Sequence, residues 1–113
     1  MQRGDLYEAT LDPVEGSEQG GRRPVLIVSR DSITRNSPVV IVIPASKLEN
    51  HTKIYPSQLV MKAGHAGLIR DSVLMAEQVR TISKTRLTKY LGHISEAGMG
   101  VVAIKLKIAM DLP

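Results

Sequence analysis

The stretch GDLYEATLDPVEGSEQGGRRPVLIVS, residues 4–29, decides how the fold begins. Apolar and polar residues alternate over residues 5–11, and β-branched residues are concentrated in residues 24–29, which predicts two strands, the second more buried. A plain hairpin needs only about two to five connecting residues. The polar, Gly-rich segment from Asp12 to Pro24 is much longer, so it is either a functional loop or a flexible, solvated hairpin tip.

The rest of the chain continues this pattern of short elements. Residues 95–112 alternate locally like a strand, but their length and Ser95 at their start favour a helix. Together the elements predict a β-rich α+β domain spanning residues 1–113, with about five strands and without regular strand–helix alternation. The further expected elements are a helical turn within 29–38 capped by Asp31, a central strand over 39–46, a polar loop over 47–56, strands within 57–61 and 71–82, and a helix over 83–92 between an N-cap at Ser83 and Gly92.

Composition narrows the classes of function. Fifteen Lys and Arg against eleven Asp and Glu give a net charge of +4, which suits an anionic partner such as nucleic acid or an acidic polypeptide. With three Tyr and no Phe or Trp, a base-stacking platform is not expected. The chain has no Cys, no apolar run long enough to span a membrane and no signal-peptide pattern, so we expect a cytoplasmic protein.

The 12–24 loop carries the residue types of a ligand-binding loop. Its glycines allow close approach of the backbone to a ligand, and its polar side chains offer donors and acceptors. No Gly-Lys-Ser/Thr follows the glycines, so the loop is not a nucleotide-binding Walker loop. The candidate contact residues are Ser17, Glu18, Gln19, Arg22 and Arg23.

Three blocks of the sequence resemble the signature segments of the MazF/PemK family of toxins. They are RGDLYEATLDPVEGSEQGGRRPVLIVS, NSPVVIVIP and DSVLMAEQVRTISKTRL, in family-like order between Arg3 and about Met110. The resemblance implies an SH3-like β-barrel of the CcdB/PemK type, with short helices and a C-terminal helix. It also implies a homodimer and a sequence-specific endoribonuclease that cuts single-stranded mRNA and is neutralised by a cognate acidic antitoxin.

Metal-independent RNA cleavage requires particular chemical groups, and the residues present can be compared with those requirements. The 2′-hydroxyl attacks the adjacent phosphate, so a site needs a proton acceptor near O2′, a cation for the phosphorane and help for the 5′-oxygen leaving group. Arg23 matches the family's catalytic arginine, and its high pKa favours an electrostatic role over proton donation. Ser46 stands where the family usually has Thr, which keeps a hydroxyl but loses the methyl that restricts its rotamer.

Other family positions are less well matched. The Asp, Arg and His that some members use correspond here to Glu77, Met75 and Ser17, so an acid–base pair on that strand is doubtful. Glu77 and Gln78 are expected to contact RNA or a second copy, or only to brace the Arg23 loop. His51 is the histidine expected nearest to RNA, because it follows Ser46 on the same loop.

No cofactor or metal is expected, because the carboxylates and histidines are scattered. Two further alternatives remain open at this level. One is a non-catalytic relative of the CcdB inhibitors of DNA gyrase on the same fold, and the other is an inactive relative of the nucleases. Without the family resemblance, Ser46 is interpreted as a turn residue that ends a strand.

Overall fold

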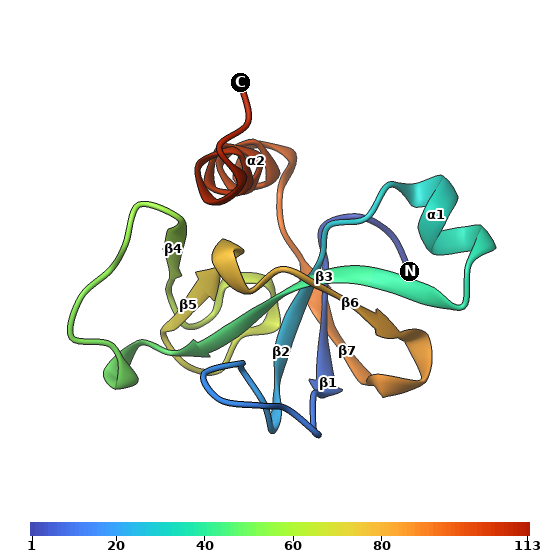
Figure 1. The fold of residues 1–113 in the computed structure, drawn as a ribbon, viewed down its shortest axis with the longest axis horizontal. Helices are drawn as coiled ribbons and strands as arrows, with labels where there is room; N and C mark the ends of the chain where they lie inside the picture. The colour runs from blue at the N-terminus through green and yellow to red at the C-terminus, as the bar shows by residue number, and fades with distance from the viewer.

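The computed structural model describes residues 1–113 as one antiparallel sheet covered by a C-terminal helix (Figure 1). Seven strands form the sheet in the order β4-β5-β3-β2-β1-β7, with β6 paired to β3 off this path. The strands are β1 (Asp5–Thr10), β2 (Arg22–Ile27), β3 (Val39–Lys47), β4 (Gln58–Met61), β5 (Ser72–Met75), β6 (Arg80–Ser83) and β7 (Leu87–His93). The helices are α1 (Asp31–Asn36) and α2 (Glu96–Met110), and four 3₁₀ turns are η1 (Leu48–Asn50), η2 (His65–Gly67), η3 (Ala76–Gln78) and η4 (Lys84–Arg86).

Residues 25–27 of β2 and 42–45 of β3 are buried on both faces of the sheet, which explains why these segments are continuously apolar. One apolar cluster lies between the sheet and α2, and a second lies on the opposite face of β2 and β3. The first includes Leu6, Leu26, Ile43, Leu74, Met99 and Val102, and the second consists of Ala9, Leu11, Val25, Ile27, Val40, Val42 and Ile82.

The predicted α+β class and the C-terminal helix are confirmed. The Ser95 hydroxyl caps α2 by accepting a bond of 3.1 Å from the Gly98 amide, as the sequence predicted. The sheet does not close into a complete barrel, because β4 and β7 lie at its two edges and do not pair with each other. None of the helices has the length and apolar character needed to cross a membrane.

The predicted helix over 83–92 is wrong. That segment forms the short turn η4 and then β7, which pairs with β1 and places Tyr90 edge-on against Tyr7. Ser83 does cap, but it caps the 3₁₀ turn, where its hydroxyl accepts a bond from the Thr85 amide. Gly92 ends no helix; a Cβ there would lie 2.4 Å from the Ala66 carbonyl oxygen, so β7 needs glycine for close packing.

Two smaller predictions also need correction. The strand expected within 71–82 is two strands, β5 and β6, because η3 interrupts it. Asp31 does not cap α1; its carboxylate instead accepts a bond of 2.8 Å from the Arg3 amide and so ties the N-terminal segment to α1.

Candidate active site

Two prolines leave a gap in the hydrogen bonding between β2 and β3. The ladder ends where Val25 faces Pro44, because neither Pro44 nor the preceding Pro24 has an N–H to donate. If the same register is carried two residues further, Arg23 faces Ser46. Cross-strand partners point to the same face of a sheet, so β2 and β3 present this arginine and this hydroxyl together.

The Arg23 guanidinium lies in this gap and binds backbone carbonyls. Its Nε donates to the Gly20 carbonyl at 2.7 Å, and its Nη1 donates to the Ala45 carbonyl at 3.2 Å. Burial lowers the pKa of Arg23 and the Asp12 carboxylate opposes that shift, but the group remains a cation at any physiological pH. The remaining N–H donors of the fork have no partner in the protein and are available to an anion.

Ser46 lies beside the carbonyl that Arg23 binds and is half-buried. Its hydroxyl forms a hydrogen bond with Nε2 of His51 and also lies 3.8 Å from the Met75 sulfur. The turn η1 positions the imidazole, because the His51 amide donates to the Leu48 carbonyl at 3.0 Å and closes the turn. The structure therefore groups Arg23, Ser46 and His51, three of the residues that the sequence indicated.

The 12–21 loop is tied to this group at its base. The Asp12 carboxylate accepts a bond of 2.9 Å from the Gly21 amide, and the Arg86 guanidinium donates to the Thr10 and Asp12 carbonyls. At the tip, Ser17 and Glu18 are exposed, and Gln19 is half-buried. These three candidates thus lie on the loop whose Gly20 carbonyl binds Arg23, and the Glu18 carboxylate accepts a bond of 2.7 Å from the Glu15 amide.

Arg22 and Glu77 lie apart from the group. Arg22 is on the opposite face of β2 from Arg23 and forms an ion pair of 2.9 Å with Glu8. Glu77 accepts bonds of 2.8 Å from Ser57 and 2.6 Å from Gln58, so it braces the start of β4 and not the Arg23 loop. The neighbouring Gln78 is half-buried in η3.

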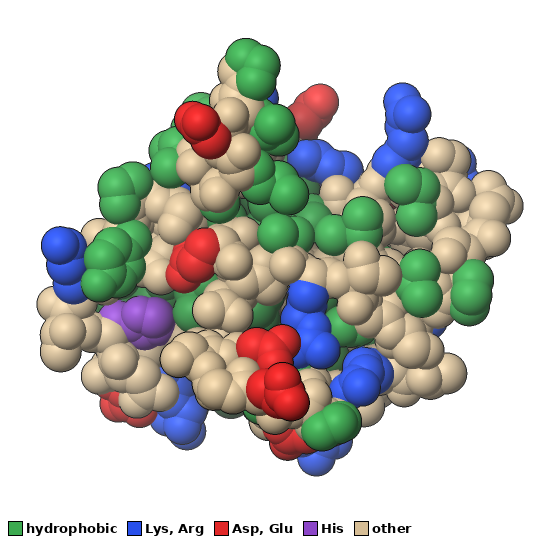
Figure 2. All heavy atoms as spheres, in the orientation of Figure 1, with side chains coloured by type: hydrophobic (Ala, Val, Ile, Leu, Met, Phe, Trp, Pro, Cys, Tyr) green, Lys and Arg blue, Asp and Glu red, His purple; other side chains and the backbone are tan.

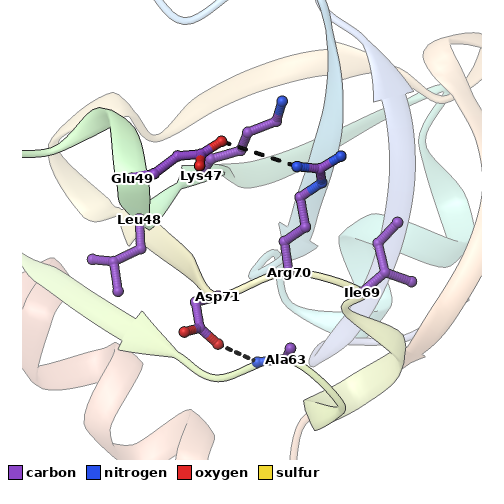
Figure 3. A pocket seen from close by; sticks show the side chains of 7 residues that line it. All are labelled: Lys47, Leu48, Glu49, Ala63, Ile69, Arg70 and Asp71. Atoms are coloured by element: carbon purple, nitrogen blue, oxygen red, sulfur yellow. Dashed lines mark hydrogen bonds and ion pairs between the residues drawn. The ribbon is translucent and has the colours of Figure 1, made fainter.

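A hollow lies where β3 ends, lined by residues that follow Ser46 in the chain and not by Arg23, Ser46 or His51 themselves (Figure 3). Glu49 and Arg70 form an ion pair of 4.0 Å across its upper side, and Asp71 accepts a bond of 2.8 Å from the Ala63 amide on its lower side. Lys47, directly after Ser46, contributes a cation that forms no ion pair. The remaining lining residues are Leu48 and Ile69.

Some features of the site were not predicted. The Ala45 and Gly20 carbonyls and the Met75 sulfur all contact the predicted pair, although a backbone oxygen and a thioether give no signal in a sequence. Arg80 faces Val42 on β3, on the same side as Ser46, and its Nη1 is buried without a hydrogen-bond partner. No group of three or more potential metal ligands occurs in the structure.

Known proteins resemble this chain over nearly its whole length. The model of a family described as "PemK-like, MazF-like toxin of type II toxin-antitoxin system" matches residues 2–110. Endoribonuclease EndoA of Bacillus subtilis is 42% identical over 112 residues, which cover 99% of this chain and 96% of that protein. Endoribonuclease MazF of Staphylococcus saprophyticus is 41% identical over 112 residues, which cover 99% and 92%.

A solved structure supports the same relationship. An endoribonuclease from a mycobacterial species, in complex with its cognate antitoxin, superposes with a TM-score of 0.80 at 25% identity, covering 100% of this chain and 97% of that one.

Proposed function

The chain belongs to the PemK-like, MazF-like toxins of type II toxin–antitoxin systems, and from that premise we propose that it is a metal-independent endoribonuclease acting on single-stranded mRNA. One observation carries the proposal: the Arg23 guanidinium is fixed to the carbonyl next to Ser46 while part of its fork stays free. Both curated relatives are named endoribonucleases, which favours an enzyme over a gyrase inhibitor.

The cleavage step follows from this geometry. The scissile phosphate binds the free N–H groups of Arg23, and the Ser46 hydroxyl contacts O2′ or a phosphate oxygen. As the 2′-oxygen attacks, negative charge grows on the phosphorane, and the fixed guanidinium stabilises it without having to reorganise. The products are a 2′,3′-cyclic phosphate and a free 5′-hydroxyl. DNA has no 2′-hydroxyl and is not cut.

The substrate extends to both sides of this pair. Ser17, Glu18 and Gln19 border it on the loop, and Lys47 with Arg70 offers charge to a neighbouring phosphate in the hollow. Arg80, whose Nη1 is buried on the same face, adds to the positive potential there. Base preference resides in the two loops, residues 17–19 and 48–54.

Two protein partners accompany the activity. An acidic antitoxin segment would place carboxylates on the cations that bind phosphate, which accords with the net charge of +4. A second copy of the chain would cover an apolar stripe on α2, where Val101, Ile104 and Ile108 are 40%, 55% and 48% exposed. Hydrophobic side chains gather over α2 on the face drawn in Figure 2.

A cleavage assay in EDTA tests the enzyme. Purified protein is incubated with a long single-stranded RNA and with DNA of the same sequence, and the ends are mapped. We expect discrete cuts in RNA alone, abolished by Arg23→Ala and strongly reduced by Ser46→Ala. Thr81→Ala, which removes an exposed hydroxyl on the opposite face of the sheet from Ser46, is the matched control. Intact RNA alongside inhibited DNA gyrase would refute the proposal.

A further inference from the structure

The proposed cleavage lacks an identified proton acceptor. A serine hydroxyl does not take up a proton near neutral pH unless a base adjoins it, and Arg23 stays protonated. The nearby carboxylates are engaged elsewhere: Asp12 binds the Gly21 amide, Glu18 binds the Glu15 amide, and Glu77 binds Ser57 and Gln58. None of them contacts Ser46.

His51 supplies the missing group. Its Nε2 is hydrogen-bonded to the Ser46 hydroxyl, and histidine is the side chain that exchanges a proton near neutral pH. We propose that His51 is the base of the reaction, acting through Ser46, an assignment that rests on the proposed function. The geometry is that of a serine activated by an adjacent imidazole, here used to relay a proton and not to form a covalent bond.

Proton transfers through Ser46 accompany the exchange of one P–O bond for another. The 2′-hydroxyl gives its proton to the Ser46 oxygen while the Ser46 proton moves to Nε2 of His51. The O2′–P bond forms, the P–O5′ bond breaks, and the leaving 5′-oxygen keeps the electron pair and takes a proton from water. The imidazolium then releases its proton to solvent, which the half-buried position of His51 permits.

Two charged side chains near the pair are held by other groups. Arg23, across the β2–β3 gap, donates to the Ala45 carbonyl, and Glu49 on η1 is paired with Arg70. The Met75 sulfur, a weaker acceptor than an imidazole nitrogen, lies 3.8 Å from the same hydroxyl.

His51→Gln tests the relay, because glutamine can keep a hydrogen bond to Ser46 but cannot exchange a proton at neutral pH. We expect the single-turnover rate to fall about 100-fold, in the range of general base catalysis. The wild-type rate should rise with pH, because a general base acts in its deprotonated form, and the variant should lose that rise. His65→Gln, on an exposed turn, is the control and should retain both rate and profile.

A substrate with sulfur in place of the 5′-bridging oxygen distinguishes a role of His51 as proton acceptor from a role as proton donor to the leaving group. Thiolate leaves without protonation, so a base defect persists with this substrate and an acid defect disappears. We expect the defect of His51→Gln to persist. Its disappearance would overturn the assignment.

Two further results decide whether His51 acts through Ser46. The double variant Ser46→Ala with His51→Gln should cut about as slowly as Ser46→Ala alone, because residues that act as a unit are not additive. Independent, multiplying effects would overturn the relay. In the wild type, nitrogen NMR should show the His51 proton on Nδ1, and a proton fixed on Nε2 at neutral pH would refute it.

Two outcomes distinguish an error in the His51 relay from an error in the proposed nuclease activity. If Arg23→Ala abolishes cleavage while His51→Gln cuts with the wild-type rate and pH profile, the nuclease stands and the relay falls. If wild-type protein does not cut RNA, both fall.

Discussion

Replacing Arg23 with lysine tests the feature on which the site depends, the fork in the proline gap. Lysine keeps the charge, but its single ammonium cannot hold the Gly20 and Ala45 carbonyls and a phosphate at once. A hydrogen bond from a charged group contributes about 1.5–3 kcal/mol. Losing one such bond in the transition state corresponds to about a 10- to 100-fold slower reaction, since about 1.4 kcal/mol is a factor of ten.

The control is Arg86→Lys. Arg86 also binds two backbone carbonyls and also ties down the base of the 12–21 loop, but it lies on the η4 side, away from Ser46. Both variants should lose stability by a similar amount, measured by urea denaturation, and only Arg23→Lys should lose single-turnover cleavage. Equal losses of activity would show that Arg23 acts only by holding the loop. Full activity of Arg23→Lys would refute the role of the fork.

Four further predictions concern stability. Gly67 has a φ of +79° and a Cβ there would lie 2.0 Å from the Leu91 carbonyl oxygen, so Gly67→Ala should lower the free energy of unfolding by about 2–4 kcal/mol in urea. Gly100→Ala, in helix α2 where a Cβ would meet nothing within 4 Å beyond the helix's own backbone, should raise it by about 0.5–1 kcal/mol, and a loss would contradict a gain from helix propensity alone. Ser95→Ala should cost about 1 kcal/mol through loss of the α2 cap, seen as a lower midpoint of thermal unfolding. Partial burial, followed by the Asp5 carboxylate and Tyr90, raises the pKa of Tyr7. The unfolded chain therefore ionises first, so the free energy of unfolding should fall as pH rises above 10.0. Tyr7→Phe should lessen that fall between about pH 9 and pH 11.

Local sequence patterns predicted the elements that local interactions determine. The alternation over residues 5–11, the apolar run of β3 and the Ser95 cap each appear in the structure where they were expected. The prediction of a helix over residues 83–92 was wrong because Ser83 gives the same capping signal for a 3₁₀ turn as for a helix. What makes the following residues a strand is pairing with β1, which is distant in sequence.

Individual side chains of the candidate site could be named from the sequence, but their arrangement could not. Arg23, Ser46 and His51 were named from the sequence, and the structure adds that one 3₁₀ turn brings residues 46 and 51 into contact. Strand alternation separates the adjacent arginines, since Arg22 and Arg23 point to opposite faces of β2. The proline gap was not foreseen, because it depends on the register between two strands.

The way Arg23 is held has a consequence for control of the protein. Its partners in the fold are neutral carbonyls, and none of the four ion pairs includes it. Folding therefore orients the cation without pairing it with a carboxylate. The carboxylates of the proposed acidic antitoxin would supply that missing partner, so its binding would neutralise the charge that the fold leaves unpaired.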